Sequence, residues 1–148
     1  MIGVIVAAHA KLAHALVETI ELVMRHPTQI VSIAIAPGDN TERFRHRLEE
    51  AVKSFEETDG VLILTDMFGG TPSNVGMTLH SPGKVEVITG TNLPMLIKAV
   101  QICASESNVE AAALMVKQAG QTAIAIASEV LAISSTPHKH PQTEVPCE

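Results

Sequence analysis

Tryptophan and tyrosine do not occur in this 148-residue chain, and phenylalanine occurs only three times. Proteins that bind single-stranded nucleic acid stack its bases on aromatic side chains, so this scarcity argues against that function. It also argues against a ligand pocket lined by aromatic rings. Apolar residues nevertheless make up 46% of the chain, too much for a disordered protein. We therefore expect a core of aliphatic side chains and methionine.

Basic residues are outnumbered by acidic ones, and the formal net charge is −6. A chain of this charge is repelled by the phosphate backbone, so nucleic acid is not expected as a partner. A basic protein surface is a more plausible partner on this ground.

Cysteines and long apolar runs are scarce too. The only two cysteines, Cys103 and Cys147, form neither a disulfide framework nor a metal-ligand pattern. No window approaches the 18 or so apolar residues that cross a bilayer. The first apolar run is too short for a signal peptide and has no basic region before it. We expect a cytoplasmic protein that needs no metal and no cofactor.

What the chain does contain is a regular alternation of two patterns. Apolar, β-branched runs predict strands, and apolar residues spaced three or four apart predict helices. The strands are expected at 2–8, 29–36, 61–65 and 84–89, and the helices at 10–25, 41–57, 72–80, 93–104 and 108–118. This spacing is typical of βαβ units. It predicts an α/β fold, a doubly wound and mostly parallel sheet of four strands with helices on both faces.

The last part of the chain is less regular. Residues 122–127 alternate in a way that fits either a fifth strand or a helix continuing through Leu131, and the preceding Gly120, taken as a helix C-cap, favours the strand. From Ser134 the composition indicates a disordered tail that contains His138 and His140. We expect one domain over residues 1–133, a tail over 134–148, and no internal repeat.

Polar side chains follow two of the predicted strands where each strand ends. His9 follows the first strand, and Asp66 follows the third, just before a Gly69-Gly70 turn and a helix that Thr71 would cap. Carboxyl ends of parallel strands meet at one edge of a sheet, where doubly wound folds hold their functional crevice. The two side chains are therefore expected to lie in one crevice.

This arrangement suits a phosphoryl group. Free N–H groups and the dipole at a helix start favour negative charge, and the hydroxyls of Thr71 and Ser73 could donate to a phosphate. Asp66 could accept one ring N–H of His9 and leave the other nitrogen as nucleophile. The plainer interpretation is a structural histidine and a turn aspartate. The turn is neither a Walker A loop nor a dinucleotide fingerprint, and Ala7-Ala8 stand where a phosphorylated-aspartate receiver needs acidic residues.

At these residues the chain resembles the mannose-type IIA proteins of the bacterial phosphoenolpyruvate-dependent sugar phosphotransferase system. The resemblance covers about residues 1–131. Four segments carry it: Gly3-Val4-Ile5-Val6-Ala7-Ala8-His9, Pro37-Gly38-Asp39-Asn40, the long stretch from Gly60 to Asn74, and Thr89-Gly90-Thr91-Asn92-Leu93-Pro94-Met95-Leu96.

The resemblance implies a phosphocarrier that accepts a phosphoryl group from phospho-HPr on His9 and passes it to a IIB protein. It implies Asp66 as the orienting carboxylate and Thr71 as a hydroxyl near the phosphate. From their places beside His9 and at the helix start, we expect Gly70, Ser73 and Ala10 to contact the phosphate as well. It also implies a homodimer that exchanges a strand around residues 121–128, and an indirect membrane association through a sugar permease. The family usually has glycine where this chain has Ala10.

Three other functions fit parts of the same pattern. A regulatory protein of the same system would use its phosphorylation state to control another protein without sugar transport. A subunit for dihydroxyacetone phosphorylation would share the early histidine but lack the Asp-x-Phe-Gly-Gly-Thr-Pro stretch. A plain small-molecule binder would use the crevice without forming a phosphohistidine.

Overall fold

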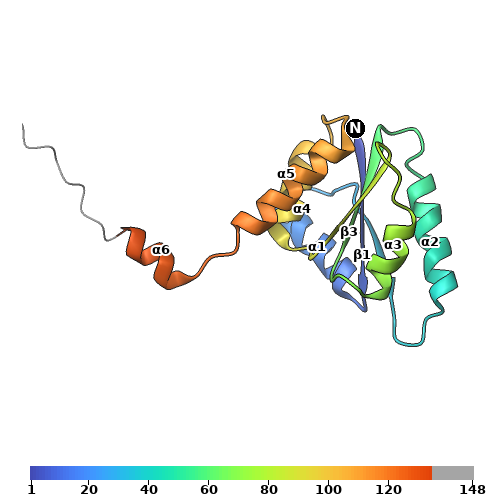
Figure 1. Cartoon of the computed structure of the whole chain (residues 1–148), viewed down its shortest axis with the longest axis horizontal. Helices are drawn as coiled ribbons and strands as arrows, with labels where there is room; N and C mark the ends of the chain where they lie inside the picture. The colour runs from blue at the N-terminus through green and yellow to red at the C-terminus, as the bar shows by residue number, and fades with distance from the viewer. Residues whose placement is uncertain (135–148) are drawn as a thin grey trace, which may run out of the picture.

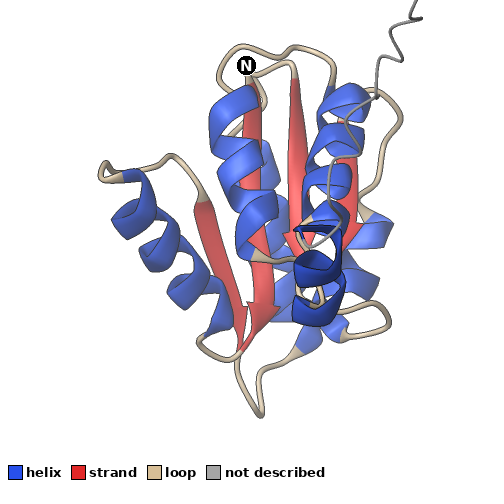
Figure 2. Cartoon of the chain, turned by 90° about the vertical axis from the view of Figure 1, so that its left-hand side faces the viewer, coloured by secondary structure: helices blue, strands red, loops and turns tan. Residues whose placement is uncertain are grey.

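The computed structural model describes residues 1–134. Four parallel strands form one sheet in the order β2-β1-β3-β4. Figure 2 shows them side by side, with helices in front of them and behind them. The predicted four-stranded parallel sheet is confirmed. Its strands are β1 (Ile2–His9), β2 (Val31–Ile35), β3 (Gly60–Thr65) and β4 (Val85–Thr89).

Helices cover both faces of the sheet, as Figure 1 shows. α2 and α3 pack on one face, and α1, α4 and α5 pack on the other. The helices are α1 (Leu12–Met24), α2 (Thr41–Lys53), α3 (Thr71–Thr78), α4 (Leu93–Ile102), α5 (Val109–Thr122) and α6 (Ala127–Ser134).

The two central strands, β1 and β3, are apolar up to their last residues, His9 and Thr65, because each faces a core on both sides. Along β1, Val4 and Val6 enter the core under α1, α4 and α5, while Ile5 enters the core under α2 and α3. This burial on both sides is what the continuous apolar runs predict.

The strand order places a topological switch between β1 and β3. The chain leaves β1 for β2 on one side and returns past β1 to β3 on the other. The connections therefore diverge at the carboxyl ends of these two strands and leave a crevice there. His9 ends β1, and Asp66 directly follows β3.

The prediction of a fifth strand at residues 122–127 is wrong for the chain as described. α5 continues through Thr122, and α6 begins at Ala127. Gly120 is not a C-cap but a buried residue within α5, where an added Cβ would lie 2.5 Å from Cγ of Met95. Gly120 thus allows α5 to pack closely on α4. From the sequence alone, a glycine in this role looks the same as a glycine that ends a helix.

α6 stands away from the rest of the protein in Figure 1. The link before it and α6 itself expose large apolar side chains, namely Ile124, Ile126, Val130 and Leu131. The described chain gives no indication of strand exchange between subunits.

The predicted tail, with His138, His140 and Cys147, lies outside the described residues except for Ser134, which ends α6. Among residues 1–134, no helix is both long enough and apolar enough to span a membrane.

Candidate active site

The two polar strand ends meet. Oδ2 of Asp66 lies 2.8 Å from Nδ1 of His9 and also accepts the backbone N–H of His9 at 3.0 Å. The other carboxylate oxygen, Oδ1, accepts the N–H of Met67 at 3.0 Å. The carboxylate is therefore held by three donors from two chain segments, and one of them is the imidazole.

Two opposing effects act on the acidity of Asp66. Burial acts to raise the pKa of its carboxyl group, but the backbone N–H and the ring of His9, together with the N–H of Met67, outweigh burial and lower the pKa below its ordinary value. Asp66 is therefore ionised at neutral pH. An ionised carboxylate can only accept hydrogen bonds, so the proton in the short contact belongs to Nδ1 of His9.

The tautomer leaves Nε2 of His9 with a free lone pair. The His9 side chain is 44% exposed, whereas that of Asp66 is 11% exposed. The ring is thus anchored at its inner nitrogen and open to approach at its outer side. The predicted contact between His9 and Asp66 is therefore present, in the arrangement that a nucleophile and its orienting carboxylate would need.

Gly70 lies against the His9 ring. A Cβ at this position would lie 2.8 Å from Cε1 and 3.5 Å from Nε2 of His9. Because 2.8 Å is shorter than carbon atoms tolerate, any larger residue at Gly70 would displace the imidazole. The preceding Gly69 has a φ of +82°, which permits the turn. The two glycines therefore have different roles. Gly69 allows the backbone angle of the turn, and Gly70 leaves room for the His9 ring.

Thr71 borders a cleft of about 300 Å³ beside the ring. It is the first residue of α3 rather than its N-cap, which is Gly70. The remaining wall comes from the exit of β2 and the start of α2. The residues that line the cleft are His9, Ala10, Ile35, Ala36, Pro37, Asp39, Thr41 and Thr71. The cleft is therefore bordered by the His9 imidazole and by two threonines, each at the start of a helix.

Ser73 and Ala10 are placed differently from what the sequence suggested. Ser73 is only 1% exposed, does not line the cleft, and its hydroxyl donates to the carbonyl of Gly70 at 3.0 Å. Ala10 lines the cleft, but its N–H donates to the carbonyl of Ile35 at 2.8 Å. Neither the Ser73 hydroxyl nor the Ala10 amide is free for a phosphate in this conformation.

Ala10 has a φ of +50°, in the left-handed region that glycine adopts without strain. This backbone angle is a physical reason for the glycine that the resembling family usually has here. Alanine at position 10 therefore adds a methyl group to the cleft wall, and its backbone angle lowers the stability of the folded protein relative to glycine.

Sequence reasoning missed three features of this site. Thr41 belongs to no motif in the sequence, although it directly follows the Pro37-Gly38-Asp39-Asn40 segment. The other two features are the side chains of Met67 and Phe68, which are apolar and exposed beside Asp66. In the sequence they stand out only as part of the Gly60 to Asn74 stretch. The sequence could have predicted their exposure, because two large apolar residues in a turn between a strand and a glycine pair have no place in the core.

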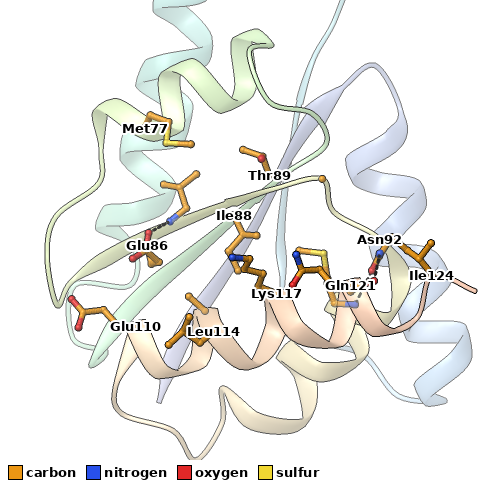
Figure 3. A pocket seen from close by; sticks show the side chains of 15 residues that line it. Met77, Glu86, Ile88, Thr89, Asn92, Glu110, Leu114, Lys117, Gln121 and Ile124 are labelled. Carbon is orange, nitrogen blue, oxygen red and sulfur yellow. Dashed lines mark hydrogen bonds between the residues drawn. The ribbon is translucent and has the colours of Figure 1, made fainter.

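A second hollow, of about 540 Å³, lies between β4 and α5 (Figure 3). Ile88 and Thr89 of β4 face Leu114, Lys117 and Gln121 of α5 across it. It contains neither His9 nor Asp66. Within residues 1–134, no three histidine, cysteine or carboxylate side chains gather in a way that could hold a metal ion.

The chain matches one protein family over most of its length. The family model described as "PTS system fructose IIA component" (EIIA-man) matches residues 3–117. The PTS system fructose-specific EIIA component of Bacillus subtilis (strain 168) is 26% identical over 69% of this chain and 70% of that protein. The PTS system mannose-specific EIIAB component of Escherichia coli (strain K12) is 29% identical over 67% of this chain, but the match spans only 31% of that longer protein.

Solved structures agree in fold. The phosphotransferase system component EIIA from Streptococcus agalactiae superposes with a TM-score of 0.79 at 29% identity, over 87% of this chain and 99% of that one. The PTS IIA protein associated with the fucose utilization operon from Streptococcus pneumoniae gives 0.76 at 26% identity, over 88% and 96%.

Proposed function

The chain belongs to the EIIA-man family of PTS system IIA components, and we propose that it carries a phosphoryl group on Nε2 of His9. As an EIIA component it is a phosphotransferase of the sugar phosphotransferase system. The proposal adds the route: phospho-HPr is the donor, and a IIB protein is the acceptor. The single observation that carries it is the 2.8 Å contact between Asp66 Oδ2 and Nδ1 of the half-exposed His9 ring.

The transfer step needs no proton to leave the nucleophile. Nε2 of His9 attacks phosphorus, the Nε2–P bond forms, and the bond from phosphorus to the donor breaks, its electron pair remaining with the donor. The imidazole then carries both Nδ1–H and the phosphoryl group, and so bears a positive charge. The ionised carboxylate of Asp66 stabilises that charge. Attack by the acceptor on the same phosphorus returns the neutral ring.

The phosphoryl oxygens are stabilised by groups at the start of α3. The hydroxyl of Thr71 lines the cleft beside the ring, and the N–H groups of the first helical turn have no partner within the helix. Gly70 allows the ring to approach this helix start, and Ser73 contributes through its backbone N–H. Ala10 contributes part of the wall. No metal or cofactor is required by this arrangement.

The test is phosphorylation with purified components. We expect the protein, incubated with phosphoenolpyruvate, enzyme I and HPr, to gain one phosphoryl group that mass spectrometry at neutral pH assigns to His9. The modification should be labile in acid and stable in base. His9→Ala should abolish it, while His26→Ala, a change at an exposed histidine beyond the end of α1, should not. Labelling of the His9→Ala variant would overturn the assignment.

We further propose that the protein is a homodimer in which residues 121–128 add to the sheet of a partner subunit. Within the described residues, β4 pairs with no strand other than β3, and beyond Val85, which bridges to Ser81, its other edge is open. The hollow of Figure 3 runs along β4, and the exposed Ile124 lies at its rim. Burial of Ile124 and Ile126 would drive the exchange, for which the last turn of α5 must unwind.

Light scattering after size exclusion tests this arrangement. A double change, Ile124→Asp with Ile126→Asp, should convert a dimer into a monomer. Leu22→Asp, at an exposed leucine on α1, is the control and should leave the dimer intact. A monomeric wild-type protein at tens of micromolar would refute the dimer without affecting the role of His9.

A further inference from the structure

The turn that follows β4 is bound to the end of β3. Thr91 donates two hydrogen bonds to one acceptor, the backbone carbonyl of Thr65: its N–H lies at 3.1 Å and its hydroxyl at 2.8 Å. Thr65 is the last residue of β3 and directly precedes Asp66. The carbonyl that Thr91 holds therefore belongs to the peptide unit that joins β3 to the carboxylate of the candidate site.

This peptide unit lies where the sheet ends. Thr65 is the final residue of β3 that is in register with a neighbour on either side, in β1 and in β4. The hydroxyl of Thr65 is buried and has no hydrogen-bond partner within the described chain, so it does not help to fix the peptide. Beyond the sheet, the Thr91 contacts and the hydrogen bonds of the Asp66 carboxylate hold the chain in place.

The orientation of this peptide unit affects the carboxylate. Because a peptide group is planar, turning the Thr65 carbonyl also turns the N–H and the Cα of Asp66, from which the side chain projects. A single hydrogen bond leaves a carbonyl free to tilt about the contact, whereas two donors restrict its direction. The second donor, the Thr91 hydroxyl, therefore narrows the range of positions open to the carboxylate that meets Nδ1 of His9 at 2.8 Å.

Thr91 is itself held on both sides along the chain. Gly90 before it has a φ of +81°, which permits the sharp exit from β4. Asn92 after it caps α4 by accepting the N–H of Met95 at 3.2 Å, and its side-chain amide donates to the carbonyl of Gly120 in α5, also at 3.2 Å (Figure 3). The turn that carries the Thr91 hydroxyl is thus anchored to two helices.

We infer that Thr91 is a positioning residue for Asp66, whose carboxylate its hydroxyl keeps aligned with the His9 ring. The inference rests on the proposed function of His9 and adds to it a residue that does not line the His9 cleft. A misplaced carboxylate lowers the rate of transfer within the complex with the donor rather than the affinity of that complex.

The test compares Thr91→Val with Thr91→Ser and Thr58→Val. Valine keeps the shape of threonine and removes the hydroxyl, whereas serine keeps the hydroxyl. Thr58 is the matched control because its hydroxyl also donates to a carbonyl of β3, that of Gly60 at 2.9 Å, but at the opposite end of the strand. Transfer from phospho-HPr to His9 is measured in single turnovers over a range of donor concentrations, which separates the maximal rate from the half-saturating concentration.

Thr91→Val should lower the maximal rate about fivefold, the effect of one lost hydrogen bond of ordinary strength, and leave the half-saturating concentration unchanged. Thr91→Ser should retain most of the wild-type rate, and Thr58→Val should transfer at the wild-type rate. A second readout follows the ring without any phosphoryl donor. In mildly alkaline buffer, where imidazole is neutral, the NMR shifts of the His9 ring nitrogens should show the Nδ1–H tautomer in wild type and Thr58→Val, and a larger share of the Nε2–H tautomer in Thr91→Val.

An unchanged maximal rate in Thr91→Val would overturn the inference, as would an equal defect in Thr58→Val or in Thr91→Ser. A slower Thr91→Val whose ring nitrogens keep the wild-type shifts would also overturn it, because the hydroxyl would then act by a route other than Asp66. Failure of the wild type to accept phosphate would instead refute the proposed function. The tautomer of His9 in Thr91→Val would then decide the positioning role by itself.

Discussion

One oxygen of Asp66 binds two groups of His9, the ring nitrogen Nδ1 at 2.8 Å and the backbone N–H at 3.0 Å. The carboxylate thereby sets the tautomer of the imidazole and also fixes the end of β1 relative to the end of β3. Two measurable properties follow from that double contact, namely the rate at which His9 is phosphorylated and the pH dependence of the protein's stability.

Replacing Asp66 by alanine should slow phosphorylation of His9 by roughly 10²–10⁴-fold, the range for loss of an orienting carboxylate. The neutral ring loses its preferred tautomer, and the phosphorylated ring loses the charge that stabilises it. Rapid-quench kinetics with phospho-HPr would measure the effect. Asp59→Asn removes a carboxylate that pairs with the N-terminal amino group at the other end of the sheet, and it should transfer phosphate at the wild-type rate. An unchanged rate in Asp66→Ala would remove Asp66 from the mechanism.

The same carboxylate should make stability depend on pH in a defined window. The pKa of Asp66 is lower in the folded protein than the ordinary value of 3.8, so the unfolded chain binds its proton first as the pH falls. Its contribution is complete above the ordinary value and is lost as the pH drops through the lower, folded pKa.

Urea denaturation of wild type and Asp66→Asn between pH 2 and 7 would reveal this contribution, because this range spans the ordinary pKa of 3.8. The difference in unfolding free energy between the two proteins should be constant from pH 5 upward and should narrow below about pH 4. A difference that stays constant down to pH 2 would show that the carboxylate pKa is not lowered by folding.

Gly70 and Gly69 should respond differently to alanine. Gly70→Ala introduces a Cβ that would lie 2.8 Å from Cε1 of His9, and the displaced ring should transfer phosphate about 10²-fold more slowly. At Gly69 an added Cβ meets nothing within 4 Å, but φ is +82°. Gly69→Ala should therefore cost about 1 kcal/mol of stability, with a smaller effect on rate. Transfer rate and unfolding free energy would be measured for both variants. Equal losses of rate, or equal losses of stability, in the two variants would contradict the different roles of Gly70 and Gly69.

Ala10→Gly should stabilise the protein. Alanine at a φ of +50° costs about 1–2 kcal/mol, and glycine recovers this less about 0.5–1 kcal/mol of backbone entropy. A net gain of about 0.5 kcal/mol is expected in the unfolding free energy. Ala15→Gly, at an exposed position within α1, should instead lose about 1 kcal/mol. Destabilisation by Ala10→Gly would show that the left-handed angle carries no strain.

The sequence predicted the fold well where patterns were long and periodic. Continuous apolar runs identified β1 and β3 as buried strands, and the helical period of α2 was placed correctly at its start, although α2 ends four residues earlier than expected, at Lys53. The pattern did not predict the structure of residues 122–127 correctly. The alternation of apolar and polar residues there favoured a strand. In the structure, α5 packs on Met95 at Gly120, and the helix continues beyond this glycine to Thr122.

The site divides in the same way. The sequence by itself determined that a histidine ends one strand and that an aspartate directly follows another, because strand length and turn residues are local properties. Only the tertiary structure decided that residues 57 positions apart share a hydrogen bond, that Gly70 has room for nothing but hydrogen beside the ring, and that the hydroxyl of Ser73 is used within its own helix start. Those facts depend on distances between segments, which chain order does not encode. They arise when the sheet and the helices packed on it bring separate turns to one edge.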